Sequence, residues 1–376
     1  MSKKRGNGEG SITKRDDGRW MARYTVRTIK GPKRRTVYGR TRAEASAKLA
    51  KAMADRDGGL IFDAGSLRVG DYLDRWLSNS VKDTVRERTY ERYEEILRLH
   101  VKPALGRLKL KALTPAHVQD FYRDRLDSGF SPATVQKIHV ILHKALSQAV
   151  SWSLVPRNAG EAVRAPRPAP KEMRPLSPDE AHRLLKTVRG DRLEALYVLA
   201  IHTGMRQGEL LGLKWENVDL AANAIRVRHT LLRTKGRVIL GEPKTKKSRR
   251  TVHLTGAASR ALEEHLERQL KVMERLGDLY RDQGLVFTTE VGTPINPSNL
   301  RKRSFAPLLQ KASLPRLRFH DLRHTCATLL LSKNIHLKYV QELLGHATVS
   351  ITLDTYSHVL PGMGNQVADA MEDVLT

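Results

Sequence analysis

The chain has 376 residues, and its 67 Lys and Arg against 40 Asp and Glu give a formal net charge of +27 at pH 7. This excess indicates a polyanionic partner, best matched by nucleic acid, and the length favours two or three domains over one core. Membrane proteins are disfavoured, because we find no amphipathic basic helix, no lipid-anchor signal and no apolar stretch near the ~20 residues that span a bilayer.

The single cysteine, Cys326, rules out an internal disulfide and a zinc cluster built on cysteines. We expect its thiol to lie in the core. The first residues, Met-Ser-Lys-Lys-Arg, lack the apolar segment of a secretory signal. These features predict a protein of a reducing cytoplasm.

Residues 1–60 form a strongly basic segment, with 17 Lys and Arg against 6 Asp and Glu. From Arg19 to Arg27, apolar and aromatic side chains alternate with polar ones, a period of two that predicts a β-strand. The preceding Asp16-Asp17-Gly18 predicts a hairpin turn. We therefore expect a β-hairpin that carries arginines on one face.

Further strand signals occur at 11–13 and 35–38, and a capping box, Thr41-Arg42-Ala43-Glu44, opens a helix. We predict a three-stranded sheet backed by one helix over residues 1–64. Its basic and aromatic side chains are candidate DNA contacts: Arg19, Trp20, Arg23, Tyr24, Arg27, Lys33, Arg34 and Arg35.

The pattern then becomes helical. Apolar residues recur on one helical face from Val69 to Leu77, and Ser131-Pro132 is a start signal for a long helix that reaches Val150. We predict a compact helical domain over residues 65–160.

A basic, proline-rich stretch follows, in which six prolines between 156 and 178 disfavour regular structure. We predict an interdomain linker at 161–176 and a further domain at 177–376. The capping box Ser177-Pro178-Asp179-Glu180 starts its first helix, its middle at 224–254 is β-rich, and its remainder is helical. The predicted fold is thus multidomain and mainly α with small β elements, ending in a mixed α/β domain.

Phosphodiester transfer without a metal requires a nucleophile, an acid for the leaving oxygen and fixed positive charge for the transition state. Arg206 is a candidate for this charge, because it follows an apolar helix that stops at Gly204. Its planar guanidinium can hold two phosphate oxygens, and Glu209 is expected to orient it. From this stretch alone, a surface salt bridge is the simpler interpretation.

A second candidate group is His320-Asp321-Leu322-Arg323-His324, whose spacing places His320 and Arg323 on one helical face. Two histidines four residues apart also resemble a zinc-protease helix. That motif has Glu directly after its first His and needs a further ligand, whereas Asp321 stands here. We expect no metal site and regard His324 as structural.

Four short motifs occur in the C-terminal half: Thr203–Leu210 (TGMRQGEL), His320–Thr325 (HDLRHT), Leu344–His346 (LGH) and Thr355–His358 (TYSH). In their order and separations they resemble the motifs of the tyrosine recombinase (phage integrase) family. One such motif can arise by chance, but four in register cannot.

The resemblance implies that Tyr356 attacks the scissile phosphate, leaving a 3′-phosphotyrosine and a free 5′ hydroxyl. It implies that Arg206 and Arg323 hold the non-bridging oxygens and that His346 donates a further hydrogen bond. His320 is the expected general base or acid. A phenol with an ordinary pKa of ~10 is a poor nucleophile at neutral pH, so we expect the surrounding cations to activate it.

The family also has a catalytic lysine on a β-hairpin, and residues 243–252 (PKTKKSRRTV) resemble its Lys-Thr-x-x-Ser-x-Arg hairpin. Lys244 matches the lysine that protonates the leaving oxygen, and Lys246 and Lys247 are alternatives. Simple phosphate contact is the other interpretation of these two lysines and applies to Arg249 as well. No metal or nucleotide cofactor is expected, because the covalent link conserves the energy of the broken bond.

The resemblance extends to the outer regions and to partners. Residues 66–165 match the family's core-binding domain in size and position, and the N-terminal sheet resembles the arm-binding domain of heterobivalent integrases. Simpler chromosome-dimer resolvases lack this sheet, so we expect integration and excision of a mobile element. A basic domain that adds only nonspecific affinity is the alternative.

The implied partners are double-stranded DNA with core-type and arm-type attachment sites, and a homotetramer that passes through a Holliday junction. An excisionase and a DNA-bending protein are candidate accessory factors, and no membrane is involved. The expected location is the bacterial cytoplasm, in association with the nucleoid. The tail after Tyr356 either closes its own domain or packs on a neighbouring protomer.

Three other classes of protein remain open. A DNA-binding protein with a decayed catalytic domain is disfavoured, because every position that the chemistry needs is filled. A type IB topoisomerase is disfavoured by the arm-like domain and the chain length. A bulk electrostatic scaffold would bind DNA without cleaving it.

Overall fold

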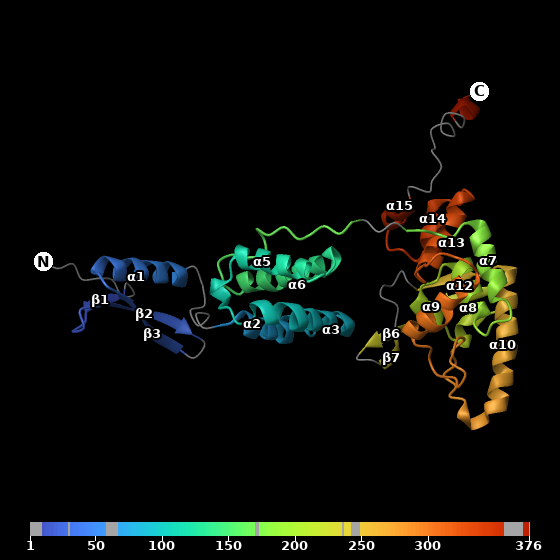
Figure 1. Ribbon diagram of the computed structural model, residues 1–376, viewed down its shortest axis with the longest axis horizontal. Helices are drawn as coiled ribbons and strands as arrows, with labels where there is room; N and C mark the ends of the chain where they lie inside the picture. Colours follow the sequence, from blue (N-terminus) through green and yellow to red (C-terminus); the bar gives the residue numbers. More distant parts are fainter. Residues whose placement is uncertain are drawn as a thin grey trace. The chain divides into compact units, whose positions relative to one another are not determined.

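The computed structural model describes residues 10–28, 31–57, 67–169, 173–234, 237–241, 249–356 and 371–375. The chain divides into two compact units, residues 1–170 and 171–376 (Figure 1). The described part of the first unit contains a three-stranded sheet with one helix, followed by a group of helices. That of the second is mainly helical with small sheets. The predicted mainly helical, multidomain fold is confirmed.

The N-terminal sheet is antiparallel in the order β1 (Ser11–Lys14), β2 (Trp20–Thr28) and β3 (Gly31–Gly39), and α1 (Arg42–Asp57) packs against it. Ala22 and Tyr24 of β2 form a small core with Leu49 of α1. The Thr41 hydroxyl accepts a hydrogen bond from the Glu44 amide at 3.1 Å, which fixes the start of the helix. The predicted three-stranded sheet with one helix is therefore present.

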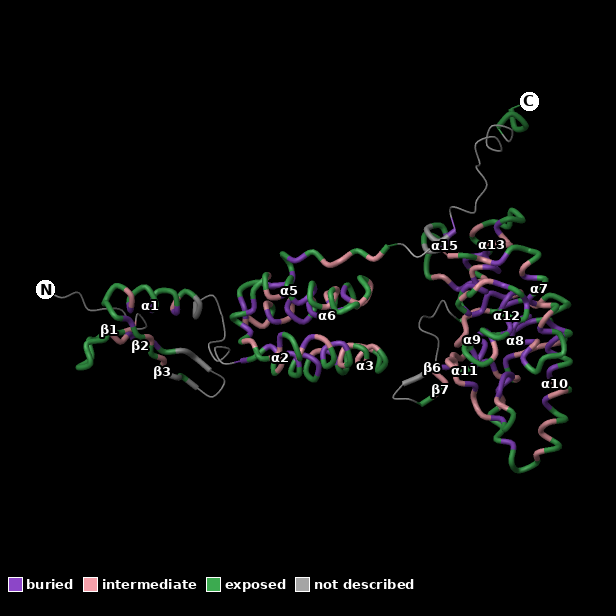
Figure 2. Tube along the Cα trace, viewed as in Figure 1, coloured by how far each residue is buried: buried purple, intermediate pink, exposed green. Residues whose placement is uncertain are grey.

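The helical part of the first unit consists of α2 (Val69–Trp76), α3 (Glu87–Ile96), α4 (Lys102–Leu105), α5 (Pro115–Asp127) and α6 (Pro132–Ser151). Short turns η2 (Leu77–Val81) and η3 (Leu97–Val101) extend α2 and α3, and η4 (Leu110–Ala112) precedes α5. Their apolar faces meet in one core, seen as the buried stretches of Figure 2. Ser131 caps α6 by accepting from the Thr134 amide at 3.3 Å, which confirms the predicted start.

The described residues between α6 and the next helix, 152–169 and 173–177, contain no helix or strand, as their prolines predict. The beginning of this segment belongs to the helical core, because Val163 is buried there and the Asn158 amide donates to the backbone of α6 at 3.0 Å. Its end belongs to the second unit, where Leu176 is buried. The linker limits at 161 and 176 remain predictions.

The second unit contains α7 (Pro178–Val188), α8 (Glu194–Thr203), α9 (Gln207–Leu211), α10 (Gly256–Leu276), α11 (Pro297–Asn299), α12 (Ala306–Lys311), α13 (Asp321–Ser332), α14 (Leu337–Leu344) and α15 (Val349–Tyr356). Short turns are η5 (Trp215–Asn217), η7 (Gly277–Leu279) and η8 (Leu300–Phe305). Helix α8 is almost entirely buried among α7, α10 and α13. The Ser177–Glu180 capping box is present, with its two hydrogen bonds at 3.0 and 3.2 Å.

Two small sheets complete this unit, as expected for residues 224–254. One contains β4 (Val218–Asp219), β5 (Ala224–Val227) and β8 (Arg250–His253), and the other is the hairpin of β6 (Thr230–Thr234) and β7 (Arg237–Gly241). The register pairs Ile225 with Val252 and Val227 with Arg250. Residues 242–248, which include the predicted catalytic lysine, lie outside the described residues.

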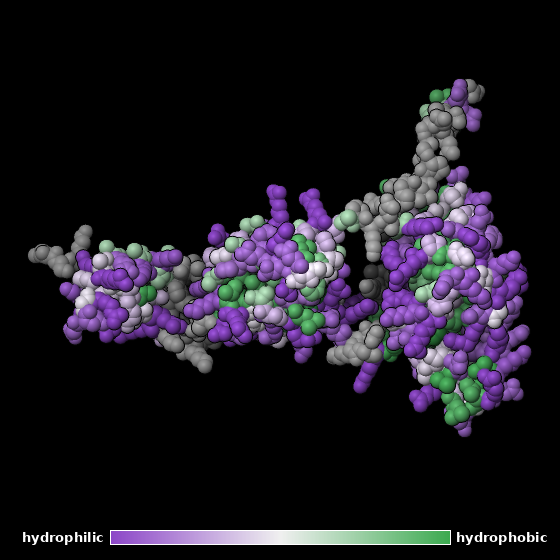
Figure 3. All heavy atoms as spheres, viewed as in Figure 1, coloured by the Kyte–Doolittle hydropathy of each residue, from purple (hydrophilic) through white to green (hydrophobic). Residues whose placement is uncertain are grey.

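Hydrophilic side chains cover most of the visible surface in Figure 3, in keeping with the net charge of +27. No helix in the described part of the chain is both long enough and apolar enough to cross a membrane.

Candidate active site

Arg206 is the N-cap residue of α9, in the short connection that follows the buried helix α8. Its amide and its Nη1 donate to the Glu209 carboxylate at 3.0 and 2.8 Å, and its Nη2 donates to the Gly345 carbonyl at 3.2 Å. Glu209 is 3% exposed, so the carboxylate holds Arg206 from beneath. The sequence placed these two residues together correctly.

Arg323 lies deeper, on α13, and is only 3% exposed. Its Nη1 donates to the Gly204 carbonyl at 2.8 Å and its Nη2 to the Leu344 carbonyl at 2.6 Å. Burial, followed by the charge of Arg206, lowers the pKa of Arg323 to about 9, which leaves it charged at neutral pH. Both arginines thus bond to the chain at the end of α14, Arg206 to the Gly345 carbonyl and Arg323 to the Leu344 carbonyl.

Arg250, on β8, also belongs to this cluster and was not among the predicted site residues. Its Nη2 contacts the second oxygen of Glu209 at 3.1 Å and its Nε donates to the Leu343 carbonyl at 2.6 Å. The available signal was the final arginine of the Lys-Thr-x-x-Ser-x-Arg pattern, which falls at position 250. Arg249 precedes the strand and is exposed.

The four residues Arg206, Glu209, Arg250 and Arg323 together carry three positive charges and one negative charge. Burial alone would raise the pKa of Glu209, but Arg250 and Arg206 lower it below its usual value, so the carboxylate is ionised. The cluster therefore keeps an excess of positive charge in a mostly buried place, which is the property of an anion site.

Gly204 connects α8 to this cluster and has a φ of 58°. A Cβ built on it would lie 2.7 Å from Leu344 and 3.2 Å from the Cys326 sulfur. We expect Gly204→Ala to lower the free energy of unfolding by about 2–4 kcal/mol, from left-handed strain and overpacking together. Denaturant titration measures the loss.

Gly190→Ala is the matched control, because Gly190 also has positive φ, 79°, but nothing within 4 Å of an added Cβ. It should lose only the strain, about 1 kcal/mol. Equal losses in the two variants would contradict the close packing at Gly204.

Two histidines lie at the start of α13. His320 is the residue at the N-terminus of α13, and its ring is 5.0 Å from that of His324. Burial, and then Arg323 and Arg206, lower the pKa of His320. Among the described residues, no group of histidine, cysteine and acidic side chains forms a cluster that could hold a metal ion.

Tyr356 is the last residue of α15 and is 1% exposed. Its hydroxyl lies 2.7 Å from Nδ1 of His324. Burial raises the pKa of Tyr356 to about 12, against the effect of Arg323, so the phenol is protonated at neutral pH. The sequence did not predict the His324 contact, since 32 residues separate the two side chains.

His346 follows α14 and is held on both sides. Its Nδ1 lies 2.8 Å from the hydroxyl of the buried Thr352, and its carbonyl accepts from Gln341 at 2.7 Å. Burial, and then Arg323 and Arg206, lower the pKa of His346 to about 4, so its ring is neutral at pH 7. The structure therefore gathers Arg206, Arg323, His346 and Tyr356 around the ends of α8, α13, α14 and α15.

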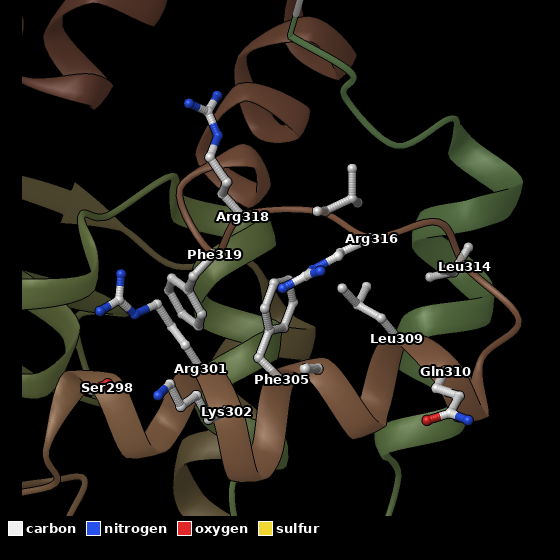
Figure 4. A pocket seen from close by; sticks show the side chains of 12 residues that line it. Ser298, Arg301, Lys302, Phe305, Leu309, Gln310, Leu314, Arg316, Arg318 and Phe319 are labelled. Atoms are coloured by element: carbon white, nitrogen blue, oxygen red, sulfur yellow. The ribbon is translucent and has the colours of Figure 1, made fainter. Parts of the chain in front are cut away.

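A basic groove of about 650 Å³, lined by residues from Ser298 to Phe319, was not predicted (Figure 4). Its floor includes Phe305 and Phe319, whose rings are 5.4 Å apart. Its charged side chains are Arg301, Lys302, Arg316 and Arg318. A second groove, of about 510 Å³, is lined by Arg226, Arg228 and Arg249. The first groove is formed within residues 298–319, and the second by 226–229 together with 249–251. No sequence motif had marked either of them.

The candidate DNA contacts of the N-terminal sheet divide between its two faces. Arg23 and Arg34 are exposed on the face opposite α1, where the register pairs Arg23 with Thr36 and Thr25 with Arg34. Tyr24 is instead buried against α1, 7% exposed, so the structure gives its ring a packing role and corrects its inclusion among surface contacts.

The other N-terminal candidates are paired with an acidic residue, partly buried, or outside the described residues. Arg19 is exposed and paired with Asp17, while Trp20 and Arg35 are partly buried. The side chains of Arg27 and Lys33 are outside the described residues, as are Lys244, Lys246 and Lys247 of the second unit.

Comparison with known proteins places this geometry in a family. The phage integrase family model matches residues 174–362, and the model of the phage integrase N-terminal SAM-like domain matches residues 69–126. The chain is 33% identical to the tyrosine recombinase XerC-like protein of Caldanaerobacter subterraneus subsp. tengcongensis, over 91% of this chain and 92% of that protein. It is 29% identical to an integrase of Streptomyces ambofaciens, over 95% and 94%.

Two solved structures share the fold. The Tn1549 transposon integrase, in complex with a circular intermediate DNA, has a TM-score of 0.69 at 20% identity, over 83% of this chain and 100% of that one. The lambda integrase tetramer bound to a Holliday junction has a TM-score of 0.57 at 19% identity, over 96% and 97%.

The fold and the family match define an enzyme that breaks and rejoins DNA, and the chain belongs to the phage integrase family. Within it, the chain is a site-specific tyrosine recombinase, an integrase of a mobile element or prophage. The resemblance inferred from the four motifs is confirmed.

Proposed function

We propose that this integrase cleaves DNA through a 3′-phosphotyrosine at Tyr356, exchanges strands through a Holliday junction, and so integrates and excises a mobile element. The observation that carries the proposal is the cluster of three guanidiniums, two of them paired with the Glu209 carboxylate and the third, Arg323, held by backbone carbonyls and close enough to Tyr356 to influence its phenol. A phosphodiester supplies the negative charge that this cluster lacks.

In this proposal Arg206 and Arg323 hold the two non-bridging oxygens of the scissile phosphate. Their hydrogen bonds to backbone carbonyls support the role, because they orient the guanidiniums before DNA binds. Glu209 and Arg250 position Arg206. Such preorganised charge stabilises the phosphorane-like transition state without reorganisation.

His346 donates a further hydrogen bond to the phosphate. The proposal is supported by its neutral ring and by the Thr352 hydroxyl at Nδ1. In the tautomer in which the Thr352 hydroxyl donates to Nδ1, the ring proton lies on Nε2 and is available to a phosphate oxygen. Lys244 protonates the leaving 5′ oxygen, with Lys246 and Lys247 as alternatives or phosphate contacts.

DNA contacts outside the reacting centre are proposed for the charged side chains of the two grooves, including Arg249, and for the open face of the N-terminal sheet. The contacts in the two grooves are proposed because several charged side chains line each groove. The contacts of the N-terminal sheet are proposed because Arg23 and Arg34 lie on one face. We assign this face to arm-type sites. Arg19, Trp20, Arg27, Lys33 and Arg35 are further candidates.

We further propose four functional parts: an arm-binding domain at 1–64, a core-binding domain at 65–160, a linker at 161–176 and a catalytic domain at 177–376. The active form is a homotetramer on core-type and arm-type sites in the bacterial cytoplasm, on nucleoid DNA. An excisionase and a DNA-bending protein are its candidate accessory factors. The exposed helix at 371–375 packs on its own or a neighbouring protomer.

An in vitro reaction tests the proposed function. The purified protein is mixed in EDTA with a supercoiled plasmid and a linear duplex that carry the element's two attachment sites. Recombinant junctions of defined sequence support the proposal. Relaxation of the plasmid without junctions would indicate a topoisomerase instead, and binding without either product would indicate a scaffold.

The arm-binding assignment makes a separate prediction. We expect Arg23→Ala with Arg34→Ala to weaken binding to an arm-type duplex by about 10–100-fold at 0.15 M salt, because phosphate and base contacts are lost. Fluorescence anisotropy with arm-type and core-type duplexes measures the change. Binding to the core-type duplex should change little.

The control removes the same charge from α1, on the other side of the sheet, with Arg42→Ala and Lys51→Ala, both exposed residues. Nonspecific attraction by the whole N-terminal region would make the two double variants equally weak. That result would remove the assignment of arm recognition to the open face.

A further inference from the structure

His324 was expected to be structural, but it makes the hydrogen bond nearest to the proposed chemistry. Its Nδ1 lies 2.7 Å from the Tyr356 hydroxyl, and its ring centre lies 5.7 Å from that of Tyr356. We propose that His324 is the general base that receives the phenolic proton as Tyr356 attacks the phosphate. This inference rests on the proposed function, in which Tyr356 is the nucleophile.

Packing fixes the ring of Tyr356 but not the direction of its O–H bond. The Tyr356 ring is buried in an apolar cluster formed by Ala327, Leu331, Val340 and Leu344 of α13 and α14. A ring held in this way has little freedom, whereas an O–H can still rotate about its C–O bond. A donor bond to Nδ1 fixes that rotation and directs the oxygen lone pairs away from His324.

The protonation state of His324 suits an acceptor. Burial, and then the neighbouring His320, lower the pKa of His324 to about 4, so the ring is neutral at pH 7. Its Nδ1 can therefore accept from a phenol that is itself protonated. A bound phosphate offsets the nearby charges of Arg318 and Arg323, which also lower this pKa, and so raises the proton affinity of His324 when it is needed.

The step balances without a further reactant. The Tyr356 oxygen forms a bond to phosphorus while the bond from phosphorus to the 5′ oxygen breaks. The phenolic proton passes along the existing hydrogen bond to Nδ1 of His324, and the leaving 5′ oxygen takes a different proton from its own acid. In the reverse reaction, imidazolium His324 returns the proton to the leaving phenol.

This assignment separates the roles of the two histidines. His320 stands at the N-terminus of α13 with its ring against that of His324, whereas His324 itself contacts the reacting oxygen. The alternative is a purely structural role, in which the hydrogen bond between His324 and Tyr356 only satisfies a buried hydroxyl and stabilises the fold. The two interpretations differ in how the reaction responds to pH.

The test measures covalent adduct formation by the full chain on a nicked attachment-site duplex, in single turnover, from pH 6.5 to 9. The variants are His324→Leu and His324→Asn, and His182→Leu, at an exposed position on α7, is the control. Thermal unfolding and DNA affinity are measured for each. Asn keeps a hydrogen-bond acceptor but cannot take a proton, so it separates catalysis from simple satisfaction of the hydroxyl.

We expect both His324 variants to lose about 10²–10⁴-fold in rate at pH 7, the contribution of a general base. The loss should shrink by up to about tenfold per pH unit as solution hydroxide replaces the base. His182→Leu should react like the wild type. A substrate with sulfur in place of the leaving 5′ oxygen needs no acid, and the loss should persist on it.

Three results would overturn the inference: wild-type rates in His324→Leu, full rescue by Asn, or a defect that does not change with pH. Restoration of the rate by the sulfur substrate would also overturn it, since it would assign His324 to the leaving group. If His324→Leu does not fold, the pH profile of His324→Asn alone decides between the two interpretations. Failure of the wild type to form any adduct would instead contradict the proposed function.

Discussion

Tyr356→Phe should form no covalent adduct with DNA, a loss of about 10⁴-fold or more, because the variant lacks only the attacking oxygen. The ring fills the same apolar cluster, so folding and DNA affinity should be almost unchanged. Denaturing gel electrophoresis of a nicked, labelled attachment-site duplex measures the adduct, and anisotropy measures the affinity.

Tyr339→Phe is the matched control, since Tyr339 lies on α14 and is 67% exposed. It should form adduct at the wild-type rate. Adduct formation by Tyr356→Phe would show that another residue is the nucleophile, and the proposed mechanism would then be wrong.

Arg323→Lys should lower the cleavage rate by about 10³-fold while the protein remains folded. Lysine keeps the charge, but one ammonium cannot donate to Gly204 and Leu344 together and also hold a phosphate oxygen. Losing one preorganised donor typically costs about 10²–10³-fold, and here the bracing bonds are altered too. Single-turnover cleavage of the nicked duplex gives the rate.

An Arg275→Lys control changes the same residue type at an exposed position on α10. It should cleave at the wild-type rate. A similar rate in Arg323→Lys would mean that charge alone suffices, and the argument from guanidinium geometry would fail.

Much of the fold could be predicted because its signals are local. Alternation around Trp20 predicts a strand, and the capping boxes at Thr41 and Ser177 mark helix starts that the structure contains. These signals depend on residues a few positions apart. Tyr24 shows the limit, because alternation defines two faces but does not say which of them a helix will cover.

The candidate site was predicted from spacing and resemblance, and the contacts between its parts were not. Arg206 and Glu209 are three residues apart and could be paired from the sequence. Arg250 could have been chosen over Arg249 only from the last position of the Lys-Thr-x-x-Ser-x-Arg pattern, whereas its place in the cluster depends on the pairing of β8 with β5. Arg250 begins β8 and its side chain is 7% exposed, whereas Arg249 precedes the strand and is exposed.

His324 illustrates the same limit more strongly. Its sequence position, directly after Arg323, suggests the first turns of a helix and no special contact. Its bond to Tyr356 exists because α13 and α15 meet around the apolar cluster, a tertiary arrangement with no local signal.

The central claim, that Tyr356 becomes joined to a 3′ phosphate, is tested most directly by mass spectrometry of the trapped adduct. Trypsin releases residues 339–376 as one peptide, because no Lys or Arg follows Lys338. Fragmentation of the nuclease-treated adduct should locate a nucleotide on Tyr356, linked through its 3′ phosphate. A nucleotide on Tyr339 or any other residue, or a link through a 5′ phosphate, would contradict the mechanism.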